Sequence, residues 1–88
     1  MTKMVITHAV ENVERWLGFK KERADALAPI ATNVTDHTAL DGSNNVAVTM
    51  DVHDMAGAQA LLTSPSPELV AAMDRHGVIP PLTAHIEK

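Results

Sequence analysis

Histidine is the residue through which this chain of 88 residues could most readily do chemistry, since it has five of them. Four, His8, His37, His53 and His85, fall in stretches typical of β-strands. The strands of one small sheet lie close together, so these imidazoles could converge. Because an imidazole titrates near neutral pH, it suits general-base work on an acidic C–H bond or a phenol. The simpler interpretation of each histidine is a solvent-facing or hydrogen-bonded structural residue.

His8 is the strongest candidate for a catalytic base. It alternates with Met4, Ile6 and Val10 along the first predicted strand, which places it in an apolar row facing the interior. A polar group in such a row is costly unless it has a partner or a purpose. Trp16, on the apolar side of the following helix, is expected in the core or as the wall of a pocket beside His8. The remaining strand histidines are candidate substrate-binding residues: His37, His53 and His85.

Other kinds of chemistry have weaker sequence support. Asp51 and His53 share one face of a strand, but with Asp54 they form no recognised metal-ligand spacing, and Asp54 is better explained as a helix cap. Cysteine is absent, so no disulfide, thiolate zinc site or iron–sulfur cluster is expected. No glycine-rich phosphate loop or nucleophilic serine motif is present. We therefore expect neither a metal nor a cofactor.

The composition limits the classes of partner that this protein is expected to bind. The length suits one domain, residues 1–88. A net charge of −4, with Trp16 and Phe19 as the only aromatic residues, argues against nucleic acid. No apolar run approaches the roughly 20 residues that span a bilayer, so we expect a cytoplasmic protein with no membrane partner. A domain this small buries only about 60–65% of its unfolded surface, which favours association into an oligomer.

The order of predicted elements indicates the fold class. Strands are expected at 4–10, 32–40, 46–52 and 82–87. One helix should begin after Asn12 and stop before Pro29. Two shorter helices should follow the caps Asp54 and Ser66, the second ending at Gly77, and Pro80-Pro81 should end that region. This β-α-β-β-α-β order, with its second helix split, predicts a ferredoxin-like α+β domain: a four-stranded antiparallel sheet with the helices on one face.

The other face of the predicted sheet has no helix to cover it. Alternation along 46–52 places Ala47, Thr49 and Asp51 there, opposite the valine row. Such a face could be solvated, but the size of the domain favours pairing with a second copy. We therefore expect a homodimer formed through the open sheet face.

Several segments resemble a known superfamily. They are Val46-Ala47-Val48-Thr49-Met50-Asp51-Val52 running into Asp54, Ala58-Gln59-Ala60-Leu61-Leu62, Ser66-Pro67-Glu68-Leu69, Ala72-Met73, Gly77-Val78 and Pro80-Pro81. The string is similar to the small dimeric α/β-barrel proteins, which include antibiotic-biosynthesis monooxygenases, polyketide cyclases and muconolactone isomerases. The resemblance implies a dimer whose two sheets pack into a barrel, with a pocket in each subunit between the sheet and its helices. The monooxygenase branch uses molecular oxygen on electron-rich aromatic polyketides without metal or flavin.

Two function classes remain open. The first is a cofactor-free monooxygenase, isomerase or cyclase that acts on a small polyketide-like or aromatic molecule, with His8 as base and Trp16 as pocket wall. The second is a non-catalytic dimeric binding or stress-response module in which the histidines are structural. The scarcity of aromatic residues and the lack of a paired acid–base motif favour the second.

Overall fold

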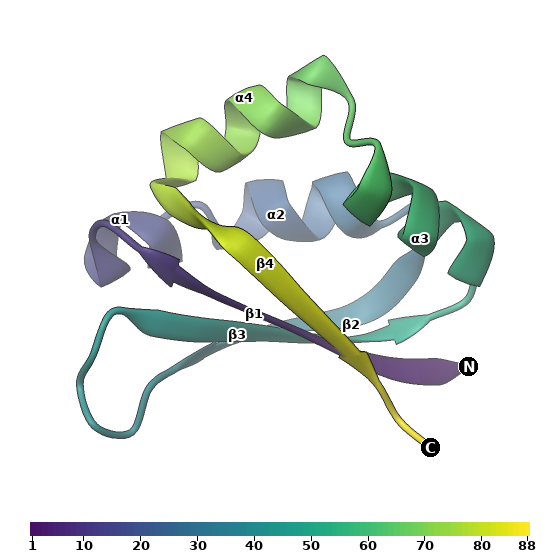
Figure 1. The fold of residues 1–88 in the computed structure, drawn as a ribbon, viewed down its shortest axis with the longest axis horizontal. Coiled ribbons are helices and arrows are strands. Elements are labelled where there is room, and N and C mark those ends of the chain that lie inside the picture. Colours follow the sequence, from purple (N-terminus) through teal and green to yellow (C-terminus); the bar gives the residue numbers. More distant parts are fainter.

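The computed structural model describes all residues, 1–88. One antiparallel sheet has the strand order β2-β3-β1-β4, and all four helices lie on one of its faces (Figure 1). This is the predicted ferredoxin-like arrangement. The elements are β1 Thr2–Val10, α1 Val13–Leu17, α2 Lys20–Leu27, β2 Ala31–Thr38, β3 Asn45–Val52, α3 Met55–Thr63, α4 Pro67–His76 and β4 Val78–Ile86.

The two central strands bury alternate side chains against the helices. His8 belongs to the buried row of β1 and pairs with Val46 of β3. The valine row of β3 faces the helices, as its alternation predicts, because side chains alternate faces along a strand. The buried side chains of these strands are Met4, Ile6, His8, Val10, Val46, Val48, Met50 and Val52.

The caps predicted for α3 and α4 are confirmed. The Asp54 carboxylate accepts a hydrogen bond from the Gly57 backbone N–H at 3.0 Å, and the Ser66 hydroxyl accepts one from Leu69 at 3.2 Å. Gly77 ends α4 in the left-handed conformation at φ 75°, where a side chain would be strained. These ends fix where α4 stops, and so where His76 enters the interior.

The prediction of one continuous helix before Pro29 was wrong. α1 ends at Leu17 and α2 begins at Lys20, with the break at Gly18, a residue that weakens helices. Phe19 lies at the break, and its ring stacks on His76 with centroids 4.5 Å apart. In this region Arg23 is buried and Ala28 is exposed.

The last strand is longer than the predicted 82–87. β4 begins at Val78 and contains Pro80-Pro81, which were expected to precede the strand. A strand at the sheet edge tolerates proline because its outer N–H groups have no ladder partner. The pairing of β1 with β4 also shifts register between Thr7 and Ala9, opposite the prolines.

The second face of the sheet is uncovered (Figure 1). Thr7 of β1 pairs with Ala47 of β3 and with Thr83 of β4 on this face. It carries small and polar side chains, as the alternation predicts. None of the helices is long and apolar enough to cross a lipid bilayer.

Candidate functional site

A cavity of about 70 Å³ lies between the sheet and the helices. Of its 15 lining residues, 12 are hydrophobic, and the polar ones are His8, Arg23 and His76. One water needs about 10–15 Å³ of such space, so the cavity has room for about five waters or one small ring. A small, mostly apolar chamber with a few polar groups is the usual form of a ligand site.

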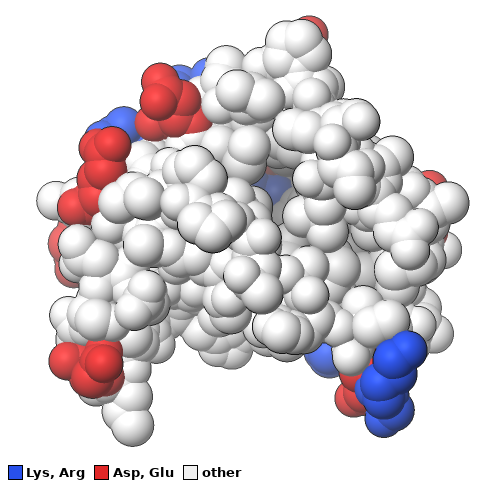
Figure 2. All heavy atoms as spheres, viewed as in Figure 1, with Lys and Arg blue, Asp and Glu red and all other residues white.

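A more open groove between α2 and the α3–α4 pair adjoins the cavity. The groove and the cavity share the side chains of Ala26, Leu61, Leu69 and Ala72. Figure 2 shows a hollow in the middle of the visible face with Lys or Arg atoms at its floor. Among the residues that line the cavity, Arg23 is the only arginine or lysine.

His8 is held in the tautomer of a proton acceptor. Its side chain lines the cavity, and the residue is 9% exposed. Nδ1 lies 3.0 Å from the Ala9 carbonyl oxygen, which can only accept, so Nδ1 carries the proton and Nε2 keeps its lone pair. Burial lowers the pKa of His8 below its ordinary value, and the positive charge of Arg23 lowers it further. The imidazole is therefore neutral at pH 7.

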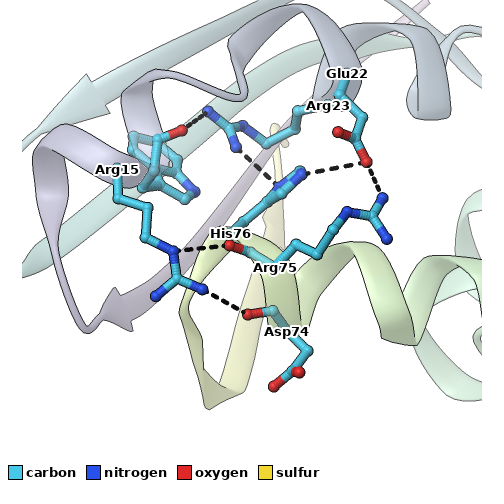
Figure 3. Close-up of polar contacts among 7 residues, drawn as sticks. Arg15, Glu22, Arg23, Asp74, Arg75 and His76 are labelled. Atoms are coloured by element: carbon cyan, nitrogen blue, oxygen red, sulfur yellow. Dashed lines mark hydrogen bonds and ion pairs between the residues drawn. The ribbon is translucent and has the colours of Figure 1, made fainter.

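Arg23 joins the elements that surround the cavity (Figure 3). It forms a two-pronged ion pair with Asp36 of β2, with Nε to Oδ1 at 3.1 Å and Nη2 to Oδ2 at 2.6 Å. Nη2 also donates to the Trp16 carbonyl at 2.9 Å. The guanidinium carbon lies 4.1 Å from the centre of the Trp16 ring, within the range of a cation–π contact. The two charged side chains are only 10% and 2% exposed.

His76 is a buried member of the same network. Its Nδ1 accepts a hydrogen bond from Arg23 Nη1 at 3.2 Å, which leaves the proton on Nε2, 3.6 Å from Glu22 Oε1. Burial lowers the pKa of His76, and Arg23 lowers it further. Glu22 is also hydrogen-bonded to Arg75, and this contact lowers the pKa of the Glu22 carboxyl. The sequence predicted only a helix-end histidine here.

Arg15 fixes the end of α4 from the neighbouring α1. Its Nε donates to the Arg75 carbonyl at 2.9 Å and its Nη2 to the Asp74 carbonyl at 3.2 Å (Figure 3). The last carbonyls of a helix lack partners within it. Arg15 therefore caps the C-terminal end of α4.

The structure separates the candidate residues into two groups. His8 and Trp16 lie together at the cavity, with ring centroids 6.0 Å apart and an edge-on angle of 79°. His37 lies on the uncovered sheet face, where its Nε2 is 2.9 Å from the Thr49 hydroxyl. His85 belongs to that face on β4, and His53 is exposed just after β3. These last three do not line the cavity, so their part in substrate binding stays a prediction.

Asp51 has partners other than His53. Its carboxylate pairs with Lys3 at 2.9 Å and accepts from Asn33 at 3.3 Å. The contact with Lys3 lowers the pKa of Asp51. No three His, Cys, Asp or Glu side chains gather as metal ligands do.

Arg23, Asp36 and His76 were missed as site residues, although the sequence carries a signal for two of them. Arg23 lies seven residues after Trp16 and one helical turn before Leu27, so it occupies the apolar side of the helix. Asp36 shares the helix-facing row of β2 with Val34, a position expected to be apolar. Two opposite charges at such positions indicate a buried pair.

Comparisons with known proteins support the fold. No protein-family model and no curated protein matches the chain. Among solved structures, it is similar to an antibiotic biosynthesis monooxygenase, with TM-score 0.67 and 12% identity over 100% of this chain and 97% of the other. It is also similar to a proposed antibiotic biosynthesis monooxygenase from Deinococcus radiodurans, with TM-score 0.62, 13% identity and coverage of 100% and 91%.

A third such structure is a proposed antibiotic biosynthesis monooxygenase from Nitrosomonas europaea. Its TM-score is 0.60 at 13% identity, and the match covers 100% of this chain and 97% of the other. These likenesses confirm the ferredoxin-like fold of the superfamily that the sequence resembles. At such identities they show the fold and leave the reaction open.

Breaking the Arg23–Asp36 pair should strongly destabilise the domain. We expect Arg23→Met to lower the free energy of unfolding by about 3–5 kcal/mol, because it leaves the Asp36 charge buried without a partner. The double variant Arg23→Met, Asp36→Leu should regain much of this loss. Urea unfolding followed by circular dichroism measures both free energies.

The matched control is Lys21→Met, since the Lys21–Asp25 pair is exposed and should contribute little to the free energy of unfolding. A single variant as stable as its control would contradict the role of the pair.

The stability of the domain should fall in mild acid. The pKa values of His8 and His76 lie below the ordinary 6.5 in the folded chain, so between these values the unfolded chain binds more protons. The contribution of the two histidines to the free energy of unfolding is therefore fully present above about pH 6.5. It is lost as the pH falls from there through the pKa values that they have in the folded chain.

The urea midpoint should accordingly be lower at pH 5.5 than at pH 7.5. Variants His8→Leu and His76→Leu should each reduce this pH dependence, whereas His53→Ala, at an exposed position, should keep it. A midpoint independent of pH in the unmodified chain would show that neither histidine has the lowered pKa.

Proposed function

We propose that this protein is a cofactor-free enzyme that binds a small organic molecule in the cavity and removes a proton from it, with His8 as the base. One observation carries the proposal: a neutral, buried imidazole with a free Nε2 lone pair lines an apolar cavity. A general base must be unprotonated at the working pH and within reach of the substrate. His8 meets the first condition, and its place on the wall favours the second.

The proposed step is a proton transfer. His8 Nε2 takes a proton from an acidic C–H or O–H group, and the electron pair of that bond stays on the substrate as an enolate or phenolate. The apolar walls, including Trp16, keep water away from this anion. An enolate can be protonated at another carbon, attack a carbonyl within the same molecule or react with molecular oxygen. These outcomes correspond to an isomerase, a cyclase and a monooxygenase, and the fold shared with proteins described as monooxygenases supports the last.

The size of the cavity favours a substrate no larger than one aromatic ring. Its volume is about 70 Å³, well below the roughly 300–1,000 Å³ of sites that bind drug-sized molecules. A polyketide-like substrate with several fused rings would enter only if α3 and α4 moved away from α2.

The alternative function is a non-catalytic binding module. One observation favours it: the group that orients His8 is a backbone carbonyl rather than a carboxylate, so no acidic partner stabilises the imidazolium that a base forms. His76 also shows that a buried histidine can serve the structure of this fold.

We also propose that two copies pair through the uncovered sheet face. The face lacks a helix (Figure 1) and carries short side chains such as Thr7 and Thr49, which allow a second sheet to approach closely. Such a dimer would bring His37 and His85 into the interface.

Replacing His8 should abolish proton abstraction. With cyclopentanone, a single-ring ketone with acidic C–H bonds beside its carbonyl, the protein should accelerate exchange of these hydrogens for deuterium in D₂O, as followed by NMR. We expect His8→Ala to lower the rate by about 100-fold or more, the contribution typical of a general base. The control Gln59→Ala, at an exposed position on α3 outside the cavity, should keep the full rate. Equal rates in the His8→Ala variant and the native chain would contradict the mechanism, and binding without exchange in the native chain would favour the binding module.

Native mass spectrometry should show a dimer. Thr49→Lys places a charge in the middle of the uncovered face and should shift the protein to the monomer, because like charges would meet across the interface. Gln59→Lys adds the same charge at an exposed position on α3 and should leave the dimer intact. A native chain that is monomeric at micromolar concentration would contradict the pairing.

A further inference from the structure

Two buried donors on residues of the cavity wall have no hydrogen-bond partner, Trp16 Nε1 and His76 Nε2. The His76 nitrogen lies 3.6 Å from Glu22 Oε1, whereas the indole N–H has no acceptor group near it. The indole Nε1 of Trp16 is buried, and no acceptor in the protein reaches it, although Trp16 is 0% exposed and lines the cavity. Buried donors almost always have a partner, and an unpaired one destabilises the fold. The acceptor for this N–H must therefore come from what fills the cavity.

Arg23 holds a second unused donor beside it. A guanidinium has five N–H bonds. Asp36 takes the one on Nε and one on Nη2, the Trp16 carbonyl takes the other on Nη2, and His76 takes one on Nη1. The second N–H on Nη1 has no acceptor in the protein. Arg23 is 9% exposed and lines the cavity.

The two unused donors are neighbours. The guanidinium carbon of Arg23 lies 4.1 Å from the centre of the Trp16 ring, so both N–H groups belong to one part of the wall. His8 stands edge-on to the same indole ring. The remaining lining is hydrophobic apart from His76. Its Nδ1 accepts from Arg23, and its Nε2 makes no hydrogen bond but lies 3.6 Å from the Glu22 carboxylate.

We propose that Trp16 Nε1 and Arg23 Nη1 bind the carbonyl oxygen of a small neutral ligand. This inference rests on the proposed function, because it names the substrate class of the same cavity. A hydrocarbon would leave both donors unpaired. A carboxylate would lose its hydration, and the Arg23 charge is already balanced by Asp36, so no free positive charge would compensate it. A neutral ketone satisfies the donors without bringing a net charge into the cavity.

Three probes of nearly equal size test this selectivity: acetophenone with a carbonyl, ethylbenzene without an acceptor, and benzoate with a permanent charge. Their dissociation constants can be measured by NMR titration of the native chain at pH 7.5. We expect acetophenone to bind about three- to tenfold more tightly than ethylbenzene, the effect of one or two modest hydrogen bonds, and benzoate to bind most weakly. Equal binding of acetophenone and ethylbenzene, or tightest binding of benzoate, would overturn the proposal.

The variant Trp16→Phe provides the second measurement. It removes the N–H and keeps an aromatic ring, and a protein that still folds is confirmed by circular dichroism. The preference for acetophenone over ethylbenzene should become smaller, because only the Arg23 donor remains, and the affinity for ethylbenzene should stay unchanged. An unchanged preference for acetophenone would overturn the role of the indole N–H. If none of the three probes binds the native chain, the cavity is no ligand site, and the proposed function falls with this inference.

Discussion

The buried ion pair between Arg23 and Asp36 is the interaction on which the interior of this domain depends. The guanidinium of Arg23 links α2 to three other elements. It binds Asp36 of β2, the Trp16 carbonyl at the C-terminal end of α1, and His76 in the last turn of α4. Burying two opposite charges costs free energy that their attraction regains only when the geometry is good and other hydrogen bonds complete it. Here the carboxylate is held at both oxygens, and two of the other three Arg23 donors bind a carbonyl and an imidazole. The pair therefore fixes how the helices sit on the sheet.

The same arginine sets the chemistry of the proposed site. Its charge opposes protonation of His8 and His76, adding to the effect of burial. It also covers the face of Trp16. Polar groups at His8, Arg23, Asp36 and His76 all occupy positions where an apolar side chain would pack at lower cost. Several polar side chains at positions that normally hold apolar ones are typical of a functional site. Their concentration around an apolar cavity supports a ligand-binding role.

Much of the fold could be predicted from the sequence because local signals agree with it. Alternation identified the buried rows of β1 and β3, and the caps at Asp54, Ser66 and Gly77 located α3 and α4. Two features could not be predicted from the sequence: the helix break at Gly18 and the start of β4 at Val78. Both involve contacts between residues far apart in the chain, which are the stacking of Phe19 on His76 and the pairing of β4 with β1. Of the site, His8 and Trp16 were found by their place in apolar patterns. Arg23 stands in the charged run Lys20-Lys21-Glu22-Arg23, and only Asp36 on another element accounts for its burial.

The central claim is that His8 presents a neutral Nε2 lone pair to the cavity, and the direct measurement is its tautomer and titration by long-range ¹H–¹⁵N NMR. The structure predicts a proton on Nδ1, where the Ala9 carbonyl accepts it, and a pKa below the ordinary 6.5. The His8→Leu variant assigns the resonances. A proton on Nε2 would contradict the claim, because that nitrogen would then have no lone pair to accept a proton. Titration at or above the ordinary value would contradict the lowered pKa.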